Sequence, residues 1–491
     1  MGKETELKLE LSPLHINALM THPLVSSAQL LSESVTLENT YFDTSALDLQ
    51  RLKMALRTRQ QGNVWLQTVK CAGQSIAGVS QRPEWETFYN GHFDFSEIEI
   101  DSVRETLDAV KVRLQPVFST NFERSTYCYK SPTGAEILLM VDLGKIQAQG
   151  QTLPICELEL ELVKGDVSDL VSLAIDLAND LSLTPSDISK AERGYRLFSG
   201  VKEQPVGFVA PRQTDEMTSE EVFRCYVSAC LVQWQGNLFG ITAREEPDYL
   251  LQWIESQERL LAVLRVFKPL LNPQWFKHWK GVLTENLQSF REQVELDYFA
   301  DQLIPEWIDL EETEASLKDL KSWILAHRAT ARQEMMQSPV LHQQGCLILR
   351  LLFDVRSDDI FVTTDQADAT FLLKRLKKLR KRALDKKLRL KTKSPGVSFP
   401  TLLALKEYRW AVDMFANIAF GKSWLHKMNK ASALLGHISA EYLLGRWQAY
   451  LQGLVATDVF LADSLQRTML IQQRKILKKL RQQSLKGLRD Y

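Results

Sequence analysis

Two short stretches decide the fold of this chain: Glu4-Thr5-Glu6-Leu7-Lys8 near the start and Cys156-Glu157-Leu158-Glu159-Leu160-Glu161-Leu162-Val163 further on. In both, charged and apolar residues alternate with a period of two, which is the pattern of a β-strand with one polar and one apolar face. The polar faces carry Glu4, Glu6 and Lys8 in the first stretch and Glu157, Glu159 and Glu161 in the second. Both stretches are therefore predicted to be strands of a half-buried antiparallel sheet.

The same alternation recurs through the first 200 residues of the chain. Further period-two segments are 39–44, 54–60, 64–70, 83–88, 118–130 and 136–149, and turn-forming residues follow two of them at 61–63 and 131–134. Apolar residues at helical spacing occur at 14–25 and 167–181. We therefore predict an α+β protein whose N-terminal part is rich in antiparallel strands with flanking helices.

A change of pattern divides the chain near residue 200. Residues 199–214 contain two prolines and two glycines without sustained periodicity, which is typical of a linker. Beyond them the apolar spacing changes to 3.6 residues, which predicts an all-α helical bundle. The charge divides at the same place: residues 1–200 carry 18 Lys and Arg against 27 Asp and Glu, and the remainder carries 42 against 34. We predict domains at 1–200 and 215–491, joined by a linker at 201–214.

The composition excludes several classes of protein. With 45% hydrophobic and 25% charged residues, the chain is expected to fold rather than to be disordered. No apolar run approaches the ~18 residues that cross a bilayer, and the six cysteines form no CxxC pair. We expect a cytoplasmic protein without a membrane span or a zinc site. The sequence motifs of zinc proteases, serine hydrolases and nucleotide-binding loops are absent, and no signature of a nucleic-acid reader is present, so nucleic acid is not an expected partner.

Cationic residues occupy the polar face of strands between the two glutamate-rich stretches. They are Arg57, Arg59, Lys70, Arg82 and Arg124. A solvated outer face is one explanation of this pattern. The alternative is an inward-facing site, because same-face carboxylates about 7 Å apart repel each other by roughly 2 kcal/mol at an effective dielectric near 20. A hard divalent ion such as Mg²⁺ or Mn²⁺ would relieve that repulsion, and the cations would then suit phosphate oxygens.

The motifs along this half, in their order, resemble the signature of CYTH domains, the triphosphate tunnel metalloenzymes. The matching motifs are Glu4-x-Glu6-x-Lys8, Asn39-Thr-Tyr41-Phe-Asp43, Leu56-Arg57-Thr-Arg59, Thr68-Val-Lys70, Gln81-Arg82-Pro-Glu84, Arg124, Asp142-Leu-Gly144, Glu157-Leu-Glu159 and Ser189-Lys190-Ala-Glu-Arg193-Gly194-Tyr195. The resemblance covers about residues 1–200 and implies an N-terminal antiparallel β-barrel with flanking helices. The barrel would form a tunnel that hydrolyses or rearranges a triphosphate with a divalent metal. The chain is similar to bacterial inorganic triphosphatases that join a CYTH domain to a CHAD domain.

The resemblance also implies a role for individual residues. The implied metal ligands are Glu4, Glu6, Asp142, Glu157 and Glu159, and Glu4, Glu6 and Lys8 form the implied catalytic motif. The implied phosphate binders are Lys8, Arg57, Arg59, Lys70, Arg82, Arg124, Lys190 and Arg193. The number of metal ligands stays open, because Glu161 shares the face of Glu157 and Glu159. Glu84 and Glu86 are equally open between an ion pair with Arg82, a solvated strand and a role in the site.

The helical half resembles a CHAD domain with part of its expected basic face replaced. Gln252 and Glu255 stand where the resemblance expects a histidine and an arginine, and Phe399 and Leu402 replace the corresponding pair in a second repeat. The cations that remain are Arg259, Arg265, Lys268, Lys406 and Arg409. Residues 374–393 contain 12 Lys or Arg, and eight more follow from Arg467 to the end. These basic helices are either solvated faces or a surface that binds polyphosphate or another polyanion.

Three hypotheses about function remain from the sequence. The first is divalent-metal-dependent hydrolysis of inorganic triphosphate to diphosphate and phosphate. The second is another CYTH reaction, such as thiamine triphosphatase or adenylyl cyclase activity. The third is a polyphosphate-binding protein whose tunnel is vestigial, and the retained set of motifs argues against it.

Overall fold

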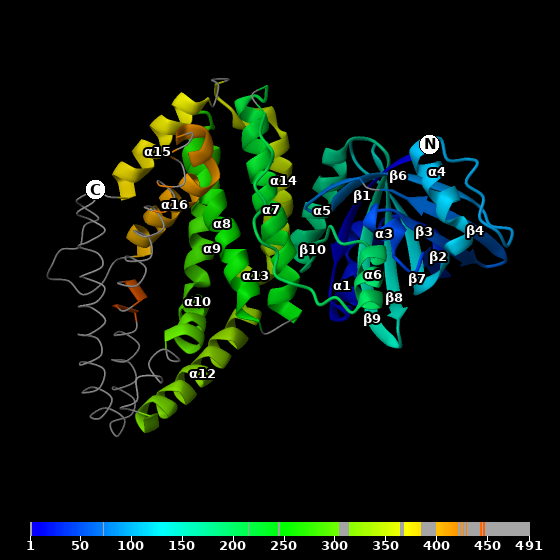
Figure 1. Cartoon of the computed structure of the whole chain (residues 1–491), viewed down its shortest axis with the longest axis horizontal. Coiled ribbons are helices and arrows are strands. Elements are labelled where there is room, and N and C mark those ends of the chain that lie inside the picture. Colours follow the sequence, from blue (N-terminus) through cyan, green and yellow to red (C-terminus); the bar gives the residue numbers. More distant parts are fainter. Residues whose placement is uncertain are drawn as a thin grey trace. The chain divides into compact units, whose positions relative to one another are not determined.

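The structure is a computed structural model, and it describes most of the chain in two units. The described residues are 2–71, 73–214, 216–243, 246–303, 314–363, 368–383 and 399–420, with Ser423, His426, Asn429, Tyr442, Leu443, Gly445 and Arg446; the side chains of 2–4, 74, 243, 302–303, 314–321, 416–417 and 420 lie outside this description. The first unit comprises Met1–Val206 and His342–Arg356, and the second comprises Gly207–Leu341 and Ser357–Tyr491. Figure 1 shows their strands and helices.

The first unit contains a closed barrel of eight antiparallel strands, as the sequence predicts. In barrel order the strands are β1 (Gly2–Glu10), β9 (Gln151–Lys164), β8 (Glu136–Ala148), β7 (Gln115–Lys130), β2 (Gln29–Asp43), β3 (Ala55–Gln61), β4 (Val64–Lys70) and β6 (Val79–Phe88). Pairing of β6 with β1 closes the ring. Two short strands, β5 (Gln74–Ile76) and β10 (Thr184–Pro185), pair with β6 and β1.

The register of β1 and β9 separates an apolar layer from a charged one. Leu7 pairs with Leu160 and Leu9 with Leu158, and all four side chains are buried. Between them, Lys8 pairs with Glu159. Because successive side chains point to opposite faces of a strand, the leucines pack on the outside of the barrel while Lys8 and Glu159 face its interior. Helix α5 (Val167–Asp180) contacts β1 and β9.

Short helices surround the barrel. The helical segments predicted near residues 14 and 167 are present as η1 (Pro13–His15), α1 (Ile16–Thr21), α2 (Pro23–Ser26) and α5. Additional elements are α3 (Asp48–Arg51), α4 (Asp101–Val110), η2 (Lys111–Arg113) and α6 (Lys190–Ser199). An apolar cluster that includes Leu56, Trp85 and Leu107 joins α3 and α4 to the strands. Helix α6 contacts β7 and β8, where Tyr195 packs with Tyr41 and Phe118.

The second unit is helical, as predicted. Its elements are α7 (Ser219–Ala243), α8 (Pro247–Phe267), α9 (Pro273–Ser289), α10 (Arg291–Tyr298), the π-helix η3 (Phe299–Leu303), α12 (Glu314–Met336), α13 (Pro339–His342, whose last residue is grouped with the first unit), η4 (Asp358–Ile360), α15 (Ala369–Ala383) and α16 (Phe399–Phe420). Helix α14 (Gln344–Arg356) belongs to the first unit. Trp234 and Trp253 are fully buried core residues.

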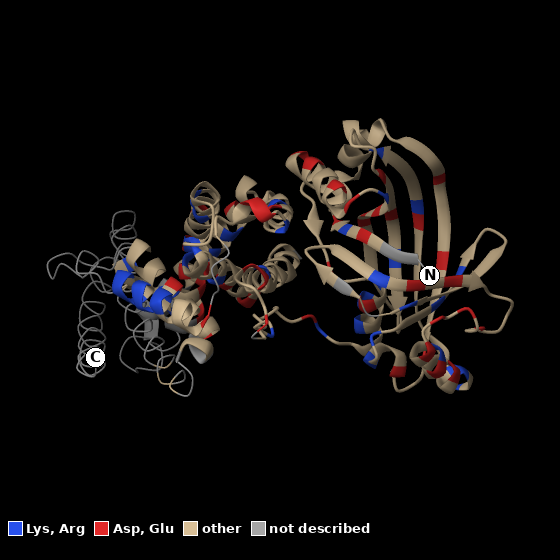
Figure 2. Ribbon diagram, turned by 90° about the horizontal axis from the view of Figure 1, so that it is seen from above, with Lys and Arg blue, Asp and Glu red and all other residues tan. Residues whose placement is uncertain are grey.

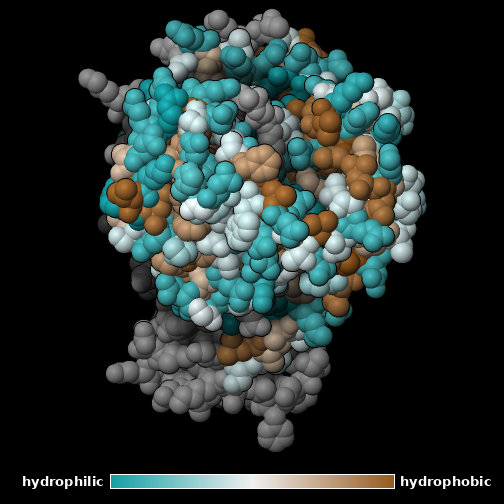
Figure 3. Space-filling model, turned by 90° about the vertical axis from the view of Figure 1, so that its right-hand side faces the viewer, coloured by the Kyte–Doolittle hydropathy of each residue, from teal (hydrophilic) through white to brown (hydrophobic). Residues whose placement is uncertain are grey.

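The structure describes only part of the basic stretches that the sequence shows. Of the basic stretch 374–393, the part up to residue 383 lies in α15, whereas the rest and the basic stretch from Arg467 lie outside the described residues. None of the described helices is long and apolar enough to cross a membrane. On the face shown in Figure 3, hydrophobic side chains occur in scattered patches among hydrophilic ones.

Candidate active site

The barrel encloses a charged cavity of about 990 Å³. Its lining cations are Lys8, Lys53, Arg57, Arg59, Lys70, Arg82, Arg124 and Lys190, and its lining acids are Glu6, Glu84, Glu86, Glu159, Glu161, Asp187 and Glu192. Figure 2 shows both signs of charge along the barrel strands. The polar faces of these strands therefore form the wall of an internal site, and the solvated-face explanation does not apply to them.

Three carboxylates form a compact cluster in the barrel. Asp142 on β8 pairs in register with Glu157 on β9, and Glu159 follows Glu157 on the same face. One oxygen from each of the three lies within 4.8 Å of the others, and Asp142 and Glu157 are fully buried. Oxygen donors at this spacing are the ligands that Mg²⁺ and Mn²⁺ prefer, so these three residues fit a hard divalent ion.

The ammonium of Lys190 lies inside this cluster. Its Nζ is 2.7 Å from Asp142 Oδ2 and 2.8 Å from Glu159 Oε1, and it also contacts Glu157 Oε1. Lys190 is the first residue of α6, and the Ser189 hydroxyl accepts a hydrogen bond from Glu192 N at that end of the helix. Although burial disfavours its charged form, the three carboxylates raise the pKa of Lys190. The lysine therefore supplies positive charge at the position that suits a metal ion.

Arg124 on β7 binds the other side of the cluster. Its Nε donates to Asp142 Oδ1 at 2.7 Å, and its Nη2 donates to Asp142 Oδ2 at 2.6 Å and to Glu159 Oε2 at 2.5 Å. Burial raises the pKa of Glu157. Burial acts in the same direction on Glu159, but Lys190 and Arg124 hold the pKa of that carboxyl well below its usual value. Glu159 is thus a carboxylate whose negative charge is stabilised by two cations.

The opposite wall is cationic. Arg57 and Arg59 on β3 share one face of their strand, and Lys70 on β4 lines the same cavity. Arg59 Nε donates to Asn39 Oδ1 at 2.9 Å, and the buried Asn39 donates through Nδ2 to Thr120 O at 2.7 Å, which fixes the guanidinium. Burial, helped by nearby Arg57 and Arg124, lowers the pKa of Arg59 to about 10. Because like charges are crowded here, an anion in the cavity would be stabilised.

Glutamates partner several of these cations. Glu84 Oε2 is 2.5 Å from Lys70 Nζ, and its other oxygen is 3.9 Å from Arg57 Nη2. Glu86 lies 3.9 Å from Arg59 Nη1 and accepts a 2.9 Å hydrogen bond from the Thr68 hydroxyl. Both glutamates line the cavity, so they belong to the site and hold its cations in place.

The remaining predicted residues are placed as follows. Glu6 lines the cavity, but its Oε1 accepts a 2.6 Å hydrogen bond from Arg82 Nη2, and it is not one of the three clustered carboxylates. Lys8 lies opposite Glu159 and is buried. Arg193 does not line the cavity; its Nη1 is 3.6 Å from Glu157 Oε2, and its Nη2 donates to Pro154 O. The side chain of Glu4 lies outside the described residues.

Several residues that line the cavity have no role in the predictions from sequence, among them Lys53, Tyr41 and Asp187. Tyr41 is buried and pairs in register with Arg57. Although burial acts to raise it, Arg57, Lys70 and Arg59 lower the pKa of this phenol. Asp187 Oδ1 accepts hydrogen bonds from Gly78 N at 2.9 Å and from the Ser75 hydroxyl, and burial raises its pKa. Tyr41 lies on the same strand face as Asn39, so the alternation in the sequence could have placed it in the cavity. No local pattern around Asp187 indicates that this residue lines a cavity.

Two family models match the chain, one in each half. A CYTH domain matches residues 2–195, and a CHAD domain matches residues 225–485. The chain is a CYTH–CHAD protein. This membership confirms the resemblance drawn from the motifs, and the CHAD match confirms it despite the replacements at Gln252, Glu255, Phe399 and Leu402.

Relatives of known structure or description resemble each half. An inorganic triphosphatase of Haemophilus influenzae is 32% identical over 199 residues, which is 40% of this chain and 56% of that protein. The chain thus spans little more than half the length of that relative. A Hippeastrum protein described as having a dominant triphosphatase activity is 21% identical, covering 41% of this chain and 98% of that one with a TM-score of 0.29. The CHAD domain of Ricinus communis is 17% identical, covering 57% and 96%, with a TM-score of 0.46.

Proposed function

We propose that the barrel of this CYTH–CHAD protein hydrolyses inorganic triphosphate to diphosphate and phosphate with Mg²⁺ or Mn²⁺ as cofactor. One observation carries the proposal: a cluster of three carboxylates reaches, through Glu159, a cavity that arginines and lysines also line. Carboxylates suit a divalent ion, and the cations suit the negative oxygens of a polyphosphate. The Haemophilus relative is described as an inorganic triphosphatase, which supports this choice of substrate.

The residues divide between holding the metal and binding the substrate. Asp142, Glu157 and Glu159 would hold the ion, and Glu4 and Glu6 would complete the acidic set by their place in the motif. The ion would neutralise charge on phosphate oxygens and activate the attacking water. Hydrolysis then needs little from the protein beyond positioning and charge stabilisation.

The phosphate binders would be the cations of the wall and of the cluster. Arg57, Arg59, Lys70 and Arg82 would bind phosphate oxygens along the cavity, and Lys8 and Arg124 would bind those next to the carboxylates. The ammonium of Lys190, which lies inside the cluster here, would turn to these phosphate oxygens when the ion binds. Arg193 would act from outside the cavity by holding Glu157 and, through it, the cluster. Guanidinium groups bind two phosphate oxygens at once, so the arginines would fix the orientation of the chain of phosphates.

The helical unit would add a weaker interaction with polyphosphate through the basic face of α15. We further propose a cytoplasmic location, because all six cysteines are free thiols, as is usual in a reducing compartment.

A substrate panel tests the proposed reaction. Inorganic triphosphate, ATP, thiamine triphosphate and long-chain polyphosphate would be supplied with Mg²⁺ and with Mn²⁺, and phosphate release would be measured. We expect inorganic triphosphate to be the preferred substrate. Faster turnover of ATP or thiamine triphosphate would support the other CYTH reactions, and no turnover of any of them would support a vestigial tunnel.

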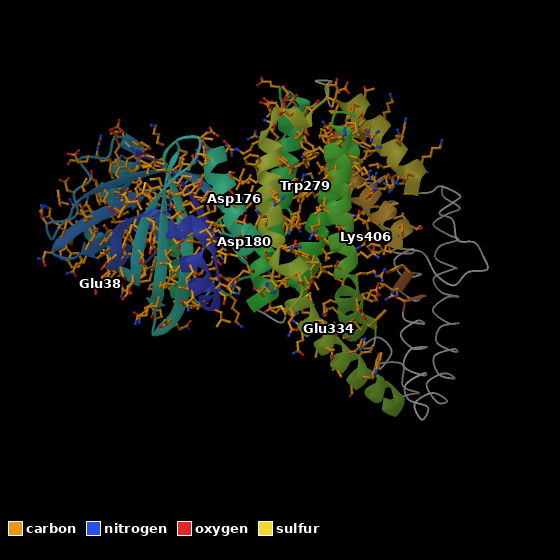
Figure 4. All side chains as sticks on the ribbon, turned by 180° about the vertical axis from the view of Figure 1, so that it is seen from behind. Glu38, Asp176, Asp180, Trp279, Glu334 and Lys406 are labelled. Carbon is orange, nitrogen blue, oxygen red and sulfur yellow. The ribbon has the colours of Figure 1, made fainter. Side chains whose placement is uncertain are left out.

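A matched pair of variants assigns the activity to this cavity. Glu159→Gln removes a clustered charge with little change of shape, and we expect turnover of triphosphate to fall by about 100-fold or more. Glu38→Gln makes the same replacement at an exposed position on β2, labelled in Figure 4, and should leave turnover unchanged. Equal activity of the two variants would contradict the placement of the site.

A further inference from the structure

Helix α14 comes from the part of the sequence that matches the CHAD domain, yet it belongs to the barrel unit. It spans Gln344–Arg356, inside the CHAD match at 225–485, and is grouped with Met1–Val206. It contacts α5 and β10, the two elements that precede α6 in the chain. The chain therefore passes from the second unit into the first and back again through this helix.

Polar contacts fix α14 at the end of α5. Arg350 Nη2 donates to Asn179 Oδ1 at 2.7 Å, and the Cys346 thiol donates to the same oxygen at 3.3 Å. Arg350 Nε also donates to Cys346 Sγ at 3.3 Å. Just before the helix, His342 Nδ1 lies 3.3 Å from the Ser182 hydroxyl. Three side chains of the 342–350 segment thus meet two residues at the end of α5.

Gly345 brings the backbone of α14 against the backbone that follows α5. A Cβ atom at this position would lie 1.8 Å from Leu183 O, 2.9 Å from Leu183 C and 3.3 Å from Pro185 Cδ. No side chain fits at such distances, so only glycine permits this approach. The adjacent Gln344 is fully buried.

The segment that α14 contacts leads directly to the carboxylate cluster. Pro185 pairs with Leu9 of β1, and Ser186 N donates to Lys8 O at 3.0 Å. Asp187 then holds Gly78 N, and Ser189 caps α6, whose first residue is Lys190. The lysine inside the cluster therefore follows the backbone contact at Leu183–Pro185 by only five residues. A shift at Leu183 would be transmitted along a segment that is bound at nearly every residue.

We propose that α14 is a positioning element for the site in the barrel. Its docking through Gly345 and Asn179 holds residues 183–190 in place and thereby keeps the backbone of Lys190 next to the carboxylate cluster, from where its ammonium can pair with the carboxylates or with phosphate. A helix from the CHAD part of the sequence would thus act on the tunnel from within the barrel unit. The docking of α14 does not depend on the proposed reaction, whereas its effect on turnover rests on that reaction.

Two glycine variants of the full chain test the docking. Gly345→Ala should push α14 away from Leu183, so amide hydrogen exchange in 181–190 and in the last turn of α5 should become about tenfold faster. Gly281→Ala is the matched control: Gly281 is also helical, in α9, and a Cβ atom there would meet no other part of the described chain within 4 Å. Alanine is the better helix former at both sites, so helix propensity alone predicts no loss of protection in either variant.

Further measurements cover the case in which Gly345→Ala fails to fold. Arg350→Ala removes the 2.7 Å contact to Asn179 without adding bulk and should accelerate exchange in the same peptides, by a smaller factor. In both variants kcat for triphosphate should fall more than KM rises, since Lys190 would lose its position. Wild-type exchange rates in residues 181–190 of folded Gly345→Ala or Arg350→Ala would overturn the proposal. Faster exchange with no triphosphatase activity even in the unmodified chain would leave the docking supported and refute the proposed reaction.

Discussion

The barrel and the helical unit both bring Lys and Arg next to Asp and Glu, but the two regions use these charges differently. In the barrel, eight cations among the described residues line a cavity of about 990 Å³. In the helical unit, two of the cations that the CHAD resemblance leaves in place meet buried carboxylates. Lys406, labelled in Figure 4, binds Glu258, and Arg265 lies 3.2 Å from Glu407. The basic face of the helical unit is thus partly neutralised from within.

Arg259 illustrates the difference most clearly. Its Nη1 donates to Gln233 Oε1 at 3.2 Å and to Glu255 Oε2 at 3.1 Å, and its guanidinium lies 3.8 Å from the ring centre of Trp410. Glu255 is one of the residues that replace the expected CHAD pattern. The replacement therefore supplies an internal partner for a retained arginine, and the same residue type binds a neighbouring helix here but lines an open cavity in the barrel.

Removing the lysine of the cluster should have the largest effect on stability. Lys190→Ala would leave the buried Asp142 and Glu157 and the half-buried Glu159 without their central cation, and loss of one partner from a buried charge cluster costs about 3–5 kcal/mol. We expect the urea midpoint to fall in the presence of chelator and to recover when Mg²⁺ is added, because the ion replaces the lost charge. Lys130→Ala is the control, since its pair with Glu136 is exposed and contributes about 0–1 kcal/mol. Equal midpoints for the two variants would refute this account of the cluster.

One arginine variant in each unit should show that turnover depends on the barrel and not on the helical unit. Arg59→Ala removes a guanidinium from the cavity wall, and we expect kcat/KM for triphosphate to fall by about 100-fold. Arg409→Ala, which breaks a 3.3 Å pair with Asp413 on α16, should leave it unchanged. The comparison fails if both variants retain normal kinetics or if both lose them.

Replacing a buried glutamate of the helical unit should lower stability and leave turnover unchanged. Glu258 accepts hydrogen bonds from Lys406 and from Trp410 Nε1 at 3.0 Å. Glu258→Gln should lower the free energy of unfolding by about 1–3 kcal/mol, because a buried partner is left imperfectly paired, while turnover of triphosphate stays normal. A loss of turnover without a loss of stability would show that this residue serves the reaction instead.

The smallest effect is expected for polyphosphate. Since part of the basic face is already paired, the full chain should bind long-chain polyphosphate weakly, and the binding should disappear near 1 M salt, where the Debye length is about 3 Å. Binding would be followed by fluorescence anisotropy of labelled polyphosphate. Tight binding that resists salt would show that the replaced CHAD positions matter less than the structure indicates.

Much of the fold could be predicted from the sequence, because the period-two pattern reports directly which face of a strand is apolar. Leu7, Leu9, Leu158 and Leu160 are predicted to share one layer and are buried there. Closure of the ring through β1 and β6 could not come from alternation, which carries no information about pairing, and its prediction rests on the family pattern. Membership of α14 in the barrel unit depends on tertiary contacts, such as those of Gly345 with Leu183 and of Arg350 with Asn179, that no local pattern reports.

Alternation in the sequence also does not show which single residues enter the carboxylate cluster. Glu157, Glu159 and Glu161 are equivalent in the sequence pattern, but the register sets them apart. Glu157 pairs with Asp142, whereas Glu161 pairs with Leu138, so no acidic residue lies directly opposite Glu161, and it is outside the three-carboxylate cluster. Glu6 is separated from the cluster for a similar reason, since closure of the barrel brings Arg82 next to it.

One measurement tests the central claim most directly. The full chain would be freed of metal by thorough chelation, and the rate of phosphate release from inorganic triphosphate would then be followed as Mg²⁺ or Mn²⁺ is added. Because the carboxylate cluster must hold an ion before the reaction can proceed, we predict no release without metal and a saturable rise with it, yielding diphosphate and phosphate in equal amounts. Release that persists after chelation, or none at any metal concentration, would contradict the account.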